Sequence, residues 1–213
     1  MLADVAMLFH GSRATAQIPV EIFSGHEKTT LDIMFFKFFK NGETQNSNFL
    51  FFNRNRVSID YEMTETNNLP QFSFTEAISY NDKRFGGFAP VMVASILNRG
   101  VYPKAGIQFA KLRKDYTFFF FFFFELYNHP NRDFIFLARF TPKLSVGWNL
   151  FSQLELYSSL PTEANEDYNL VQRFRLGLKR MDFQFGFGAD FTSRGRAKFA
   201  YTQNIGVFLR YEF

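Results

Sequence analysis

Hydrophobic and polar residues alternate with a period of two along most of the chain. Within residues 168–179, for example, Phe174 and its alternate neighbours are mostly apolar, whereas Arg173 and its alternate neighbours are mostly polar. The same alternation runs through 183–191 and 204–213. An amphipathic helix would repeat every three or four residues instead. The pattern predicts β-strands that each have one apolar and one polar face.

Short segments rich in Gly, Pro, Asn and Asp separate these runs, as turn chemistry requires. The first strand is the weakest, because it is short and contains Pro19. Several others exceed the five or six residues that are usual in soluble proteins. The predicted strands are 18–24, 29–40, 48–63, 71–80, 86–98, 101–113, 116–127, 133–143, 148–158, 168–179, 182–192 and 197–213.

The positions of the tyrosines indicate whether the apolar faces of the strands contact lipid or the core of a soluble protein. An outer-membrane barrel places them at its two rims, whereas a soluble sandwich would scatter them through its core. Near predicted strand ends lie Trp148 and the tyrosines Tyr61, Tyr80, Tyr102, Tyr116, Tyr127, Tyr157, Tyr168 and Tyr211. The sequence therefore predicts an all-β protein, a closed antiparallel transmembrane β-barrel of about twelve strands, with ten as the alternative.

The polar faces carry charges of both signs on many strands. In a barrel whose apolar face meets lipid, these side chains point into the lumen, where opposite charges can pair. A soluble sheet would expose them to solvent instead. The predicted lumen-facing residues are Arg54, Arg56, Asp60, Glu62, Arg139, Glu155, Arg173, Arg175, Asp190, Arg210 and Glu212.

Composition excludes several other classes. Phenylalanine supplies 33 of the 213 residues, which argues against disorder. No apolar run of about 18 residues is present to cross a bilayer as a helix. The chain has no cysteine, and so no disulfide framework or thiolate site. The net charge is +4, but the basic residues are scattered, so no nucleic-acid partner is predicted.

The last residues, IGVFLRYEF, form an alternating strand that ends in Tyr211 and Phe213. This segment resembles the C-terminal recognition strand of bacterial outer-membrane β-barrels, although Gly206 is two residues farther from the end than that signal prefers. The resemblance implies a bacterial outer-membrane location, contact with outer-membrane lipids and assembly by the barrel-assembly machinery. Residues 14–17, Ala-Thr-Ala-Gln, also resemble exported barrels of the Bacteroidota.

Two stretches fit this pattern poorly. Residues 118–124 are seven consecutive phenylalanines, so half of them would face a polar lumen unless they form an apolar layer there. Lys37 would face lipid together with Phe35, and Glu76 together with Phe74. Such charges are tolerated best near the membrane interfaces.

Candidate chemistry is sparse. Ser24 and His26 share a strand face and Glu27 follows, which is the residue set of a possible outer-membrane lipid hydrolase. No third group that would orient the base can be identified, so a polar turn is the preferred interpretation. No His, Cys or carboxylate cluster has metal-ligand spacing, and neither a metal nor any other cofactor is predicted.

The chain is predicted to consist of a lead-in or signal-like segment, 1–17, and one barrel domain, 18–213. The lead-in has three interpretations: a degenerate signal peptide, a periplasmic lead-in, or residues left by expression. The predicted connections are short, which favours a non-catalytic structural or accessory subunit of a larger outer-membrane assembly that includes other outer-membrane proteins. The alternative is a narrow pore for ions or small solutes, and a lipid hydrolase is the third possibility.

Overall fold

The chain folds into one closed antiparallel β-barrel. The computed structural model describes residues 18–42, 45–62, 70–98, 100–127 and 130–213. The predicted lead-in, 1–17, and most of the segment between the third and fourth strands lie outside the described residues. Within the described residues, the only helical element is one 3-10 turn, η2 (Lys83–Phe85). Its N-cap, Asp82, accepts hydrogen bonds from Arg84, and these lower the pKa of the Asp82 carboxyl to about 2.

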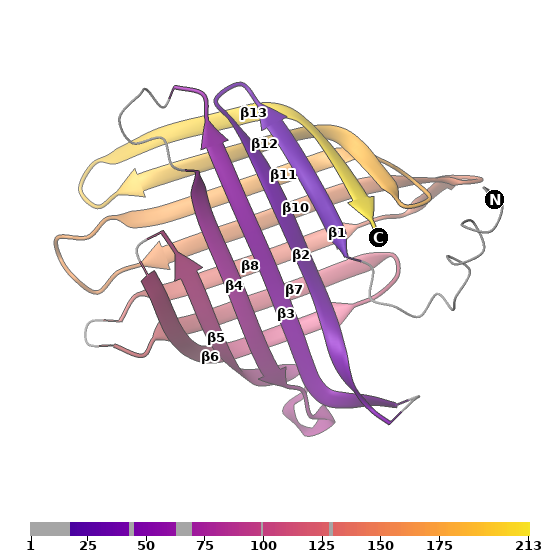
Figure 1. Cartoon of the computed structure of the whole chain (residues 1–213), viewed down its shortest axis with the longest axis horizontal. Coiled ribbons are helices and arrows are strands. Elements are labelled where there is room, and N and C mark those ends of the chain that lie inside the picture. The colour runs from indigo at the N-terminus through magenta and orange to yellow at the C-terminus, as the bar shows by residue number, and fades with distance from the viewer. Residues whose placement is uncertain (1–17, 43–44, 63–69, 99, 128–129) are drawn as a thin grey trace, which may run out of the picture.

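Apart from the short strand β9, the strands follow one another around the barrel in chain order, and each pairs with the next (Figure 1). They are β1 (Pro19–Gly25), β2 (Lys28–Asn41), β3 (Gln45–Asp60), β4 (Gln71–Tyr80), β5 (Phe88–Leu97), β6 (Gly100–Leu112), β7 (Tyr116–Glu125), β8 (Arg132–Phe140), β9 (Lys143–Ser145), β10 (Trp148–Leu160), β11 (Tyr168–Arg180), β12 (Phe183–Gly195) and β13 (Phe199–Glu212).

The barrel closes where the first and last strands meet. β1 pairs antiparallel with β13 over its whole length, and the backbones of Ile18 and Phe213 exchange two hydrogen bonds of 3.1 and 3.2 Å. β10 pairs with both β8 and β11, which completes a ring of twelve strands. The prediction of a closed twelve-stranded barrel is confirmed. β9 was not predicted; it is a three-residue strand paired only with the start of β10.

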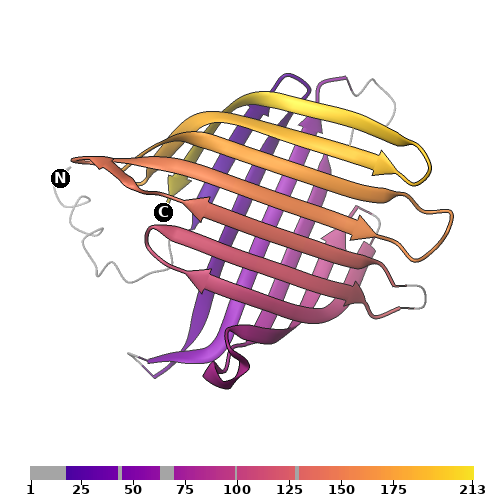
Figure 2. The ribbon, with the colours of Figure 1, turned by 180° about the vertical axis from the view of Figure 1, so that it is seen from behind.

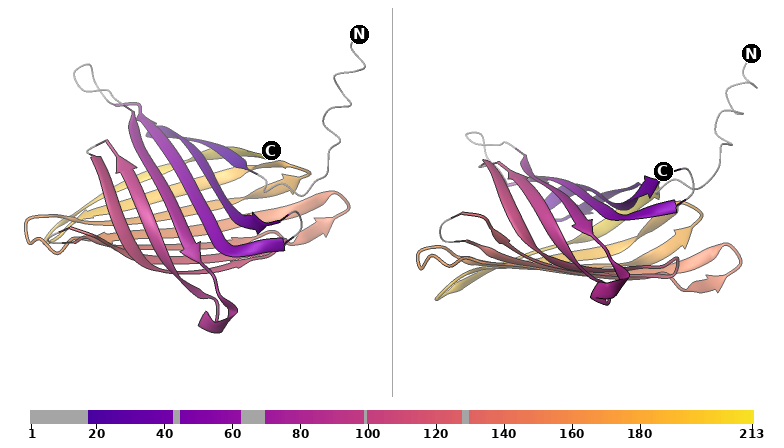
Figure 3. Two further views of the ribbon diagram at one scale, coloured as in Figure 1. Left: turned by 60° about the horizontal axis from the view of Figure 1, so that its bottom comes forward. Right: turned by 90° about the horizontal axis from the view of Figure 1, so that it is seen from below.

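Two walls of steeply tilted strands enclose the interior. β1 to β6 cross in front of the later strands in Figure 1, and the view from behind shows β7 to β13 as the second wall (Figure 2). Seen from below, the two walls lie close together and the barrel is flattened (Figure 3). Side chains that point inward from one wall can therefore contact side chains from the other.

The outer surface of the barrel is largely apolar. On β11, Leu176 faces outward and is 59% exposed, whereas its neighbour Arg175 faces inward and is 3% exposed. The predicted orientation of this region is confirmed: the exposed side chains include Phe174, Leu176, Phe183, Phe185, Phe187, Val207 and Leu209. A register slip of one residue would have inverted every one of them.

One lateral half of the interior is a phenylalanine-rich core, which we call the apolar seam. It joins β2 to β5 on one wall to β7 and β8 on the other, and it includes Phe52, Phe119, Phe121 and Phe123. The rings of Phe52 and Phe119 stack with centroids 5.1 Å apart. Alternate phenylalanines of the 118–124 run thus form an apolar layer inside the barrel, and the others face outward.

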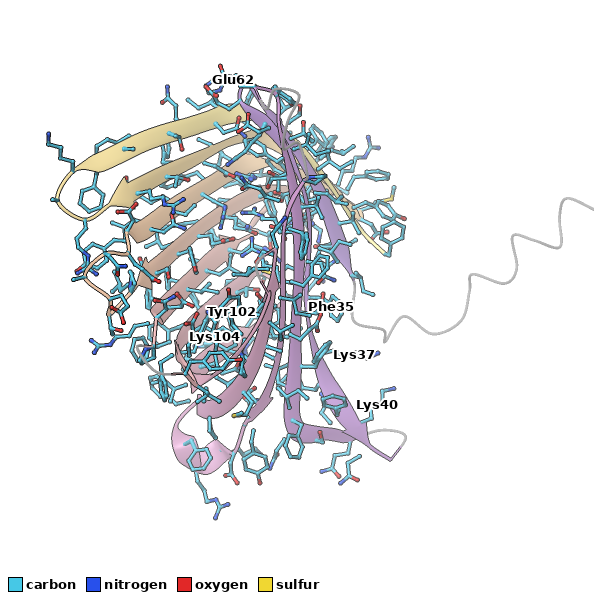
Figure 4. All side chains as sticks on the ribbon, turned by 60° about the vertical axis from the view of Figure 1, so that its left-hand side comes forward. Phe35, Lys37, Lys40, Glu62, Tyr102 and Lys104 are labelled. Atoms are coloured by element: carbon cyan, nitrogen blue, oxygen red, sulfur yellow. The ribbon has the colours of Figure 1, made fainter. Side chains whose placement is uncertain are left out.

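Two tyrosines expected at the rims point into the barrel instead. Tyr157 packs against the apolar seam, and its hydroxyl donates to Asp133 at 3.4 Å. Tyr102 points inward on the same side of β6 as Lys104 (Figure 4). The prediction that these two belong to an aromatic girdle is wrong, because the alternation of a strand decides which way a side chain faces, however near the strand end it lies.

A glycine pair lets β11 and β12 approach closely. Gly177 and Gly186 are register partners, and a Cβ on Gly186 would lie 2.2 Å from the backbone oxygen of Leu176. Because the obstacle is backbone, we expect Gly186→Ala to destabilise the barrel by about 1–3 kcal/mol. Urea unfolding of detergent-refolded protein measures this. The exposed Thr202→Ala should shift the free energy of unfolding by less than about 0.5 kcal/mol, and equal effects of both variants would contradict the prediction.

Candidate functional site: the charged interior

The other lateral half of the interior is mostly polar, and we call it the polar column. Charged and amide side chains there surround one small apolar cluster, Phe23, Phe151 and Phe208. At one end, Lys28 of β2 lies opposite Asp60 of β3. At the other end, Lys179 and Gln184 both donate to Glu212. The column between them is formed by side chains of β1 to β3 on one wall and β8 and β10 to β13 on the other. They are Glu21, Asp32, Arg54, Arg56, Arg139, Gln153, Glu155, Arg173, Arg175, Asp190, Asn204 and Arg210.

Ion pairs in the middle of the column join the two walls. Arg54 of β3 donates to both oxygens of Asp32 on the adjacent strand, at 3.1 and 2.6 Å. It also donates to both oxygens of Glu155 on β10, at 2.8 and 2.9 Å. Arg173 is a second donor to Glu155, and Arg56 pairs with Asp32 at 2.9 Å. Arg54 is thus a bidentate bridge across the lumen, where a low local dielectric strengthens each charge-assisted bond.

A second network lies beside the first and combines charges with aromatic rings. Arg175 donates to Glu21 at 2.9 Å and to Asp190 at 2.7 Å. Its guanidinium group lies 3.9 Å from the centre of the Phe23 ring, within cation–π range. Arg210 donates to Gln153 at 3.1 Å. These contacts tie β1 to β11, β11 to β12 and β13 to β10, around the place where the barrel closes.

Several buried polar atoms of the column have no protein hydrogen-bond partner. There are seven such atoms among the described residues, and four of them belong to arginines. Some lie within ion-pair distance of an opposite charge but make no hydrogen bond, as Arg210 Nε does at 3.6 Å from Glu21. Buried polar atoms normally bind water when no protein group serves them. Among the described residues these atoms are Glu21 Oε2, Arg56 Nε, Arg139 Nη2, Asn169 Oδ1, Arg173 Nε, Gln184 Oε1 and Arg210 Nε. The column is therefore a charged interior in which ion pairs lie beside polar atoms that have no protein partner.

The structure brings most of the predicted interior residues together. Arg54, Arg56, Arg139, Glu155, Arg173, Arg175, Asp190, Arg210 and Glu212 all face the polar column, and Asp60 lies at its end. Glu62 does not line it: β3 ends at Asp60, and the exposed Glu62 lies beyond the strand at the rim (Figure 4). Tyr211 faces outward, and its ring contacts Phe213 with centroids 4.7 Å apart.

Sequence reasoning missed several interior charges. Glu21 and Asp32 belong to the column, whereas Lys104 pairs with Asp133 near the apolar seam and with Glu125 at 3.2 Å. Each alternates correctly along its strand, but each shares its face with apolar residues, as Glu21 does with Phe23. A rule that assigns the apolar face of a strand to lipid fails where one face carries both apolar and charged residues. Only the alternation of inward and outward positions along the strand could have indicated that these charges point inward.

The possible hydrolase set is not assembled. The partners of Ser24 Oγ are the hydroxyl groups of Tyr61, at 3.2 Å, and Thr29. His26 Nδ1 accepts from the backbone of Ile205 at 3.0 Å, and its Nε2 lies 3.3 Å from Glu27. These residues form a polar turn at the rim. Within the described ranges, no group of three or more His, Asp or Glu is placed to hold a metal ion.

Comparison with known proteins gives similarity of fold. No protein-family model matches the chain, and no curated protein sequence does either. Among solved structures, the chain is similar to KdgM porin (TM-score 0.48, 12% identity, covering 92% of this chain and 99% of that one). It is also similar to NanC porin (TM-score 0.49, 10% identity, 93% and 100%). A third is the translocator domain of the autotransporter NalP from Neisseria meningitidis (TM-score 0.34, 12% identity, 100% and 93%).

KdgM and NanC are bacterial outer-membrane β-barrels, the class that the C-terminal strand of this chain resembles. No helix in the described part of the chain is long and apolar enough to span a bilayer.

Proposed function

We propose that the chain is an integral β-barrel of the bacterial outer membrane and forms a narrow pore for ions or small solutes. The apolar outer surface supports the membrane location, because exposed phenylalanine, leucine and valine side chains cover several adjacent strands, as on β11 to β13. A closed ring of strands leaves no unpaired backbone edge, which the hydrocarbon core of a bilayer requires. By the C-terminal resemblance, Phe213 and the rim around it face the periplasm.

The observation that carries the pore is the polar column. Charged and amide side chains extend from Lys28 and Asp60 at one rim to Lys179 and Glu212 at the other, around the buried rings of Phe23, Phe151 and Phe208. The column's unpaired donors belong to guanidinium groups, so it should attract anions more than cations. The Arg54–Glu155 bridge narrows the passage, which favours small solutes. A pore of this kind needs no catalytic group and no cofactor.

Planar-bilayer recordings test the pore. We expect a small unit conductance with anion preference, and Arg139→Gln should lower the anion-to-cation permeability ratio by about twofold, because it removes an interior charge. The matched control is Arg84→Gln, whose side chain lies exposed in the turn after β4 and should leave the ratio unchanged. A refolded barrel that passes no current and no small solute would contradict the pore.

A non-catalytic structural or accessory subunit is the second candidate. The apolar seam favours it, since Phe119, Phe121 and Phe123 fill half of the interior and leave that half no room for a channel. The bridge between Arg54 and Glu155 also ties the walls together. A non-conducting barrel that copurifies with other outer-membrane proteins would support this candidate. Membership of the Bacteroidota stays a prediction.

A further inference from the structure

A small polar island lies on the outer wall of the barrel. Asn53 and Asn55 of β3 and Glu76 of β4 alternate with inward-facing residues and so point outward, on the same side as Phe35, which Figure 4 shows projecting away from the barrel. Asn53 donates to Glu76 at 2.5 Å, and Asn55 donates to Asn53 at 3.2 Å. Asn53 and Glu76 lie near the centres of their strands, far from either rim.

This position is unfavourable for an isolated barrel in lipid. The central part of an outer-membrane barrel normally presents apolar side chains, and a carboxylate there loses hydration without compensation. On the other wall, the corresponding part of β11 to β13 carries Phe174, Phe187 and Val207. The outward-facing Ser152 of β10 donates to the backbone oxygen of Phe140, so its hydroxyl is satisfied within the barrel.

The island keeps unused hydrogen-bonding capacity of both kinds. Each asparagine amide has two N–H groups, and one of each is used within the island. The second oxygen of Glu76 and the side-chain oxygen of Asn55 accept no hydrogen bond from the described residues. The island therefore offers donors and acceptors together, which makes it complementary to a copy of itself turned by 180°.

Small side chains beside the island allow a second barrel to come close. The register partner of Glu76 on β5 is Ala94, and the partner of Ala94 on β6 is Pro103. Ala105 follows on the outer face of β6. Membrane interfaces favour small residues next to polar ones, because the backbones can then approach and the polar groups can meet.

We propose that the outer face of β3 to β6, centred on Asn53, Asn55 and Glu76, is the interface of a symmetric dimer of this chain in the membrane. The amide of Asn55 in each copy donates to the Glu76 carboxylate of the other copy, so that the contact forms twice around the two-fold axis. The dimer rests on the membrane location in the proposed function but not on conduction.

Because the chain has no cysteine, single cysteines report the interface directly. Ala94→Cys, next to the island, should form dimers with a short bis-maleimide in native membranes. Leu176→Cys, on the opposite wall and 59% exposed, is the matched control and should not. In the Ala94→Cys background, Glu76→Leu should lower the yield of dimers about tenfold, whereas Glu76→Gln should largely keep it, since glutamine still accepts a hydrogen bond.

Glu76→Leu replaces a polar outward residue with an apolar one, so it should fold, and its heat-modifiable mobility on gels checks this. The proposal is overturned if Ala94→Cys links no better than Leu176→Cys, if Glu76→Leu leaves the links unchanged, or if Ala94→Cys links only to a different protein. Bilayer recordings separate the two proposals: dimers without current overturn the pore alone, and current without dimers overturns the dimer alone.

Discussion

Replacing Glu155 with alanine should destabilise the barrel by about 3–5 kcal/mol, because it leaves two largely buried arginines without their shared carboxylate. Glu155 is 1% exposed, and it accepts hydrogen bonds from Arg54 of the facing wall and Arg173 of the adjacent strand. Arg54 would keep Asp32 as a partner, but its ion pair with the opposite wall would be lost. Removing one member of a buried network costs more than the network contributes as a whole, because the remaining charges cannot rehydrate.

The measurement is urea unfolding of the refolded barrel, followed by the fluorescence of Trp148, which is the only tryptophan of the chain. Glu155→Gln keeps an acceptor for the guanidinium groups and should fall between the wild type and Glu155→Ala. Glu27→Ala removes a half-exposed carboxylate in the β1–β2 turn and should change stability by less than about 0.5 kcal/mol. Equal midpoints for Glu155→Ala and Glu27→Ala would show that the bridge contributes nothing.

The strands could be predicted because a strand with one buried and one exposed face has alternating apolar and polar residues in its sequence. Alternation and turn residues are local, and they located all twelve wall strands, with boundaries that differ by up to about three residues. β9 was missed because three residues, Lys143 to Ser145, are too few to show a period. The outward face of β11 to β13 was also predictable, because apolar and polar residues separate there almost completely.

The division of the interior into an apolar seam and a polar column could not be predicted. It depends on which strands face each other across a flattened barrel, and alternation carries no information about that. Phe121 and Arg175 both point inward from the same wall, yet one meets Phe52 and the other meets Glu21. The prediction for Tyr102 and Tyr157 was wrong for a related reason. Both lie near strand ends, but both occupy inward positions in the alternation of their strands, and the alternation decides the direction of the side chain.

The charge of the last side chain should decide whether the barrel assembles in cells. Phe213 is 70% exposed, and its ring packs edge-on against Tyr211, which in turn contacts Phe183 on β12. Phe213→Lys keeps both backbone hydrogen bonds with Ile18 but removes the aromatic end that the barrel-assembly machinery is proposed to recognise. We expect the amount of heat-modifiable protein in the outer membrane to fall about tenfold or more, a change that corresponds to at least about 1.4 kcal/mol of recognition.

The stability of the finished barrel should hardly change, because an exposed rim residue contributes little to packing and a lysine at the interface costs only about 0–1 kcal/mol. Refolding Phe213→Lys in detergent and unfolding it in urea tests this half of the prediction. Phe187→Leu, on the lipid-facing side of β12 and 74% exposed, is the control for the loss of an outward aromatic ring and should assemble normally. If Phe213→Lys reaches the outer membrane at wild-type levels, the C-terminal strand is not the assembly signal; if it also fails to refold in detergent, Phe213 acts through barrel closure rather than through recognition.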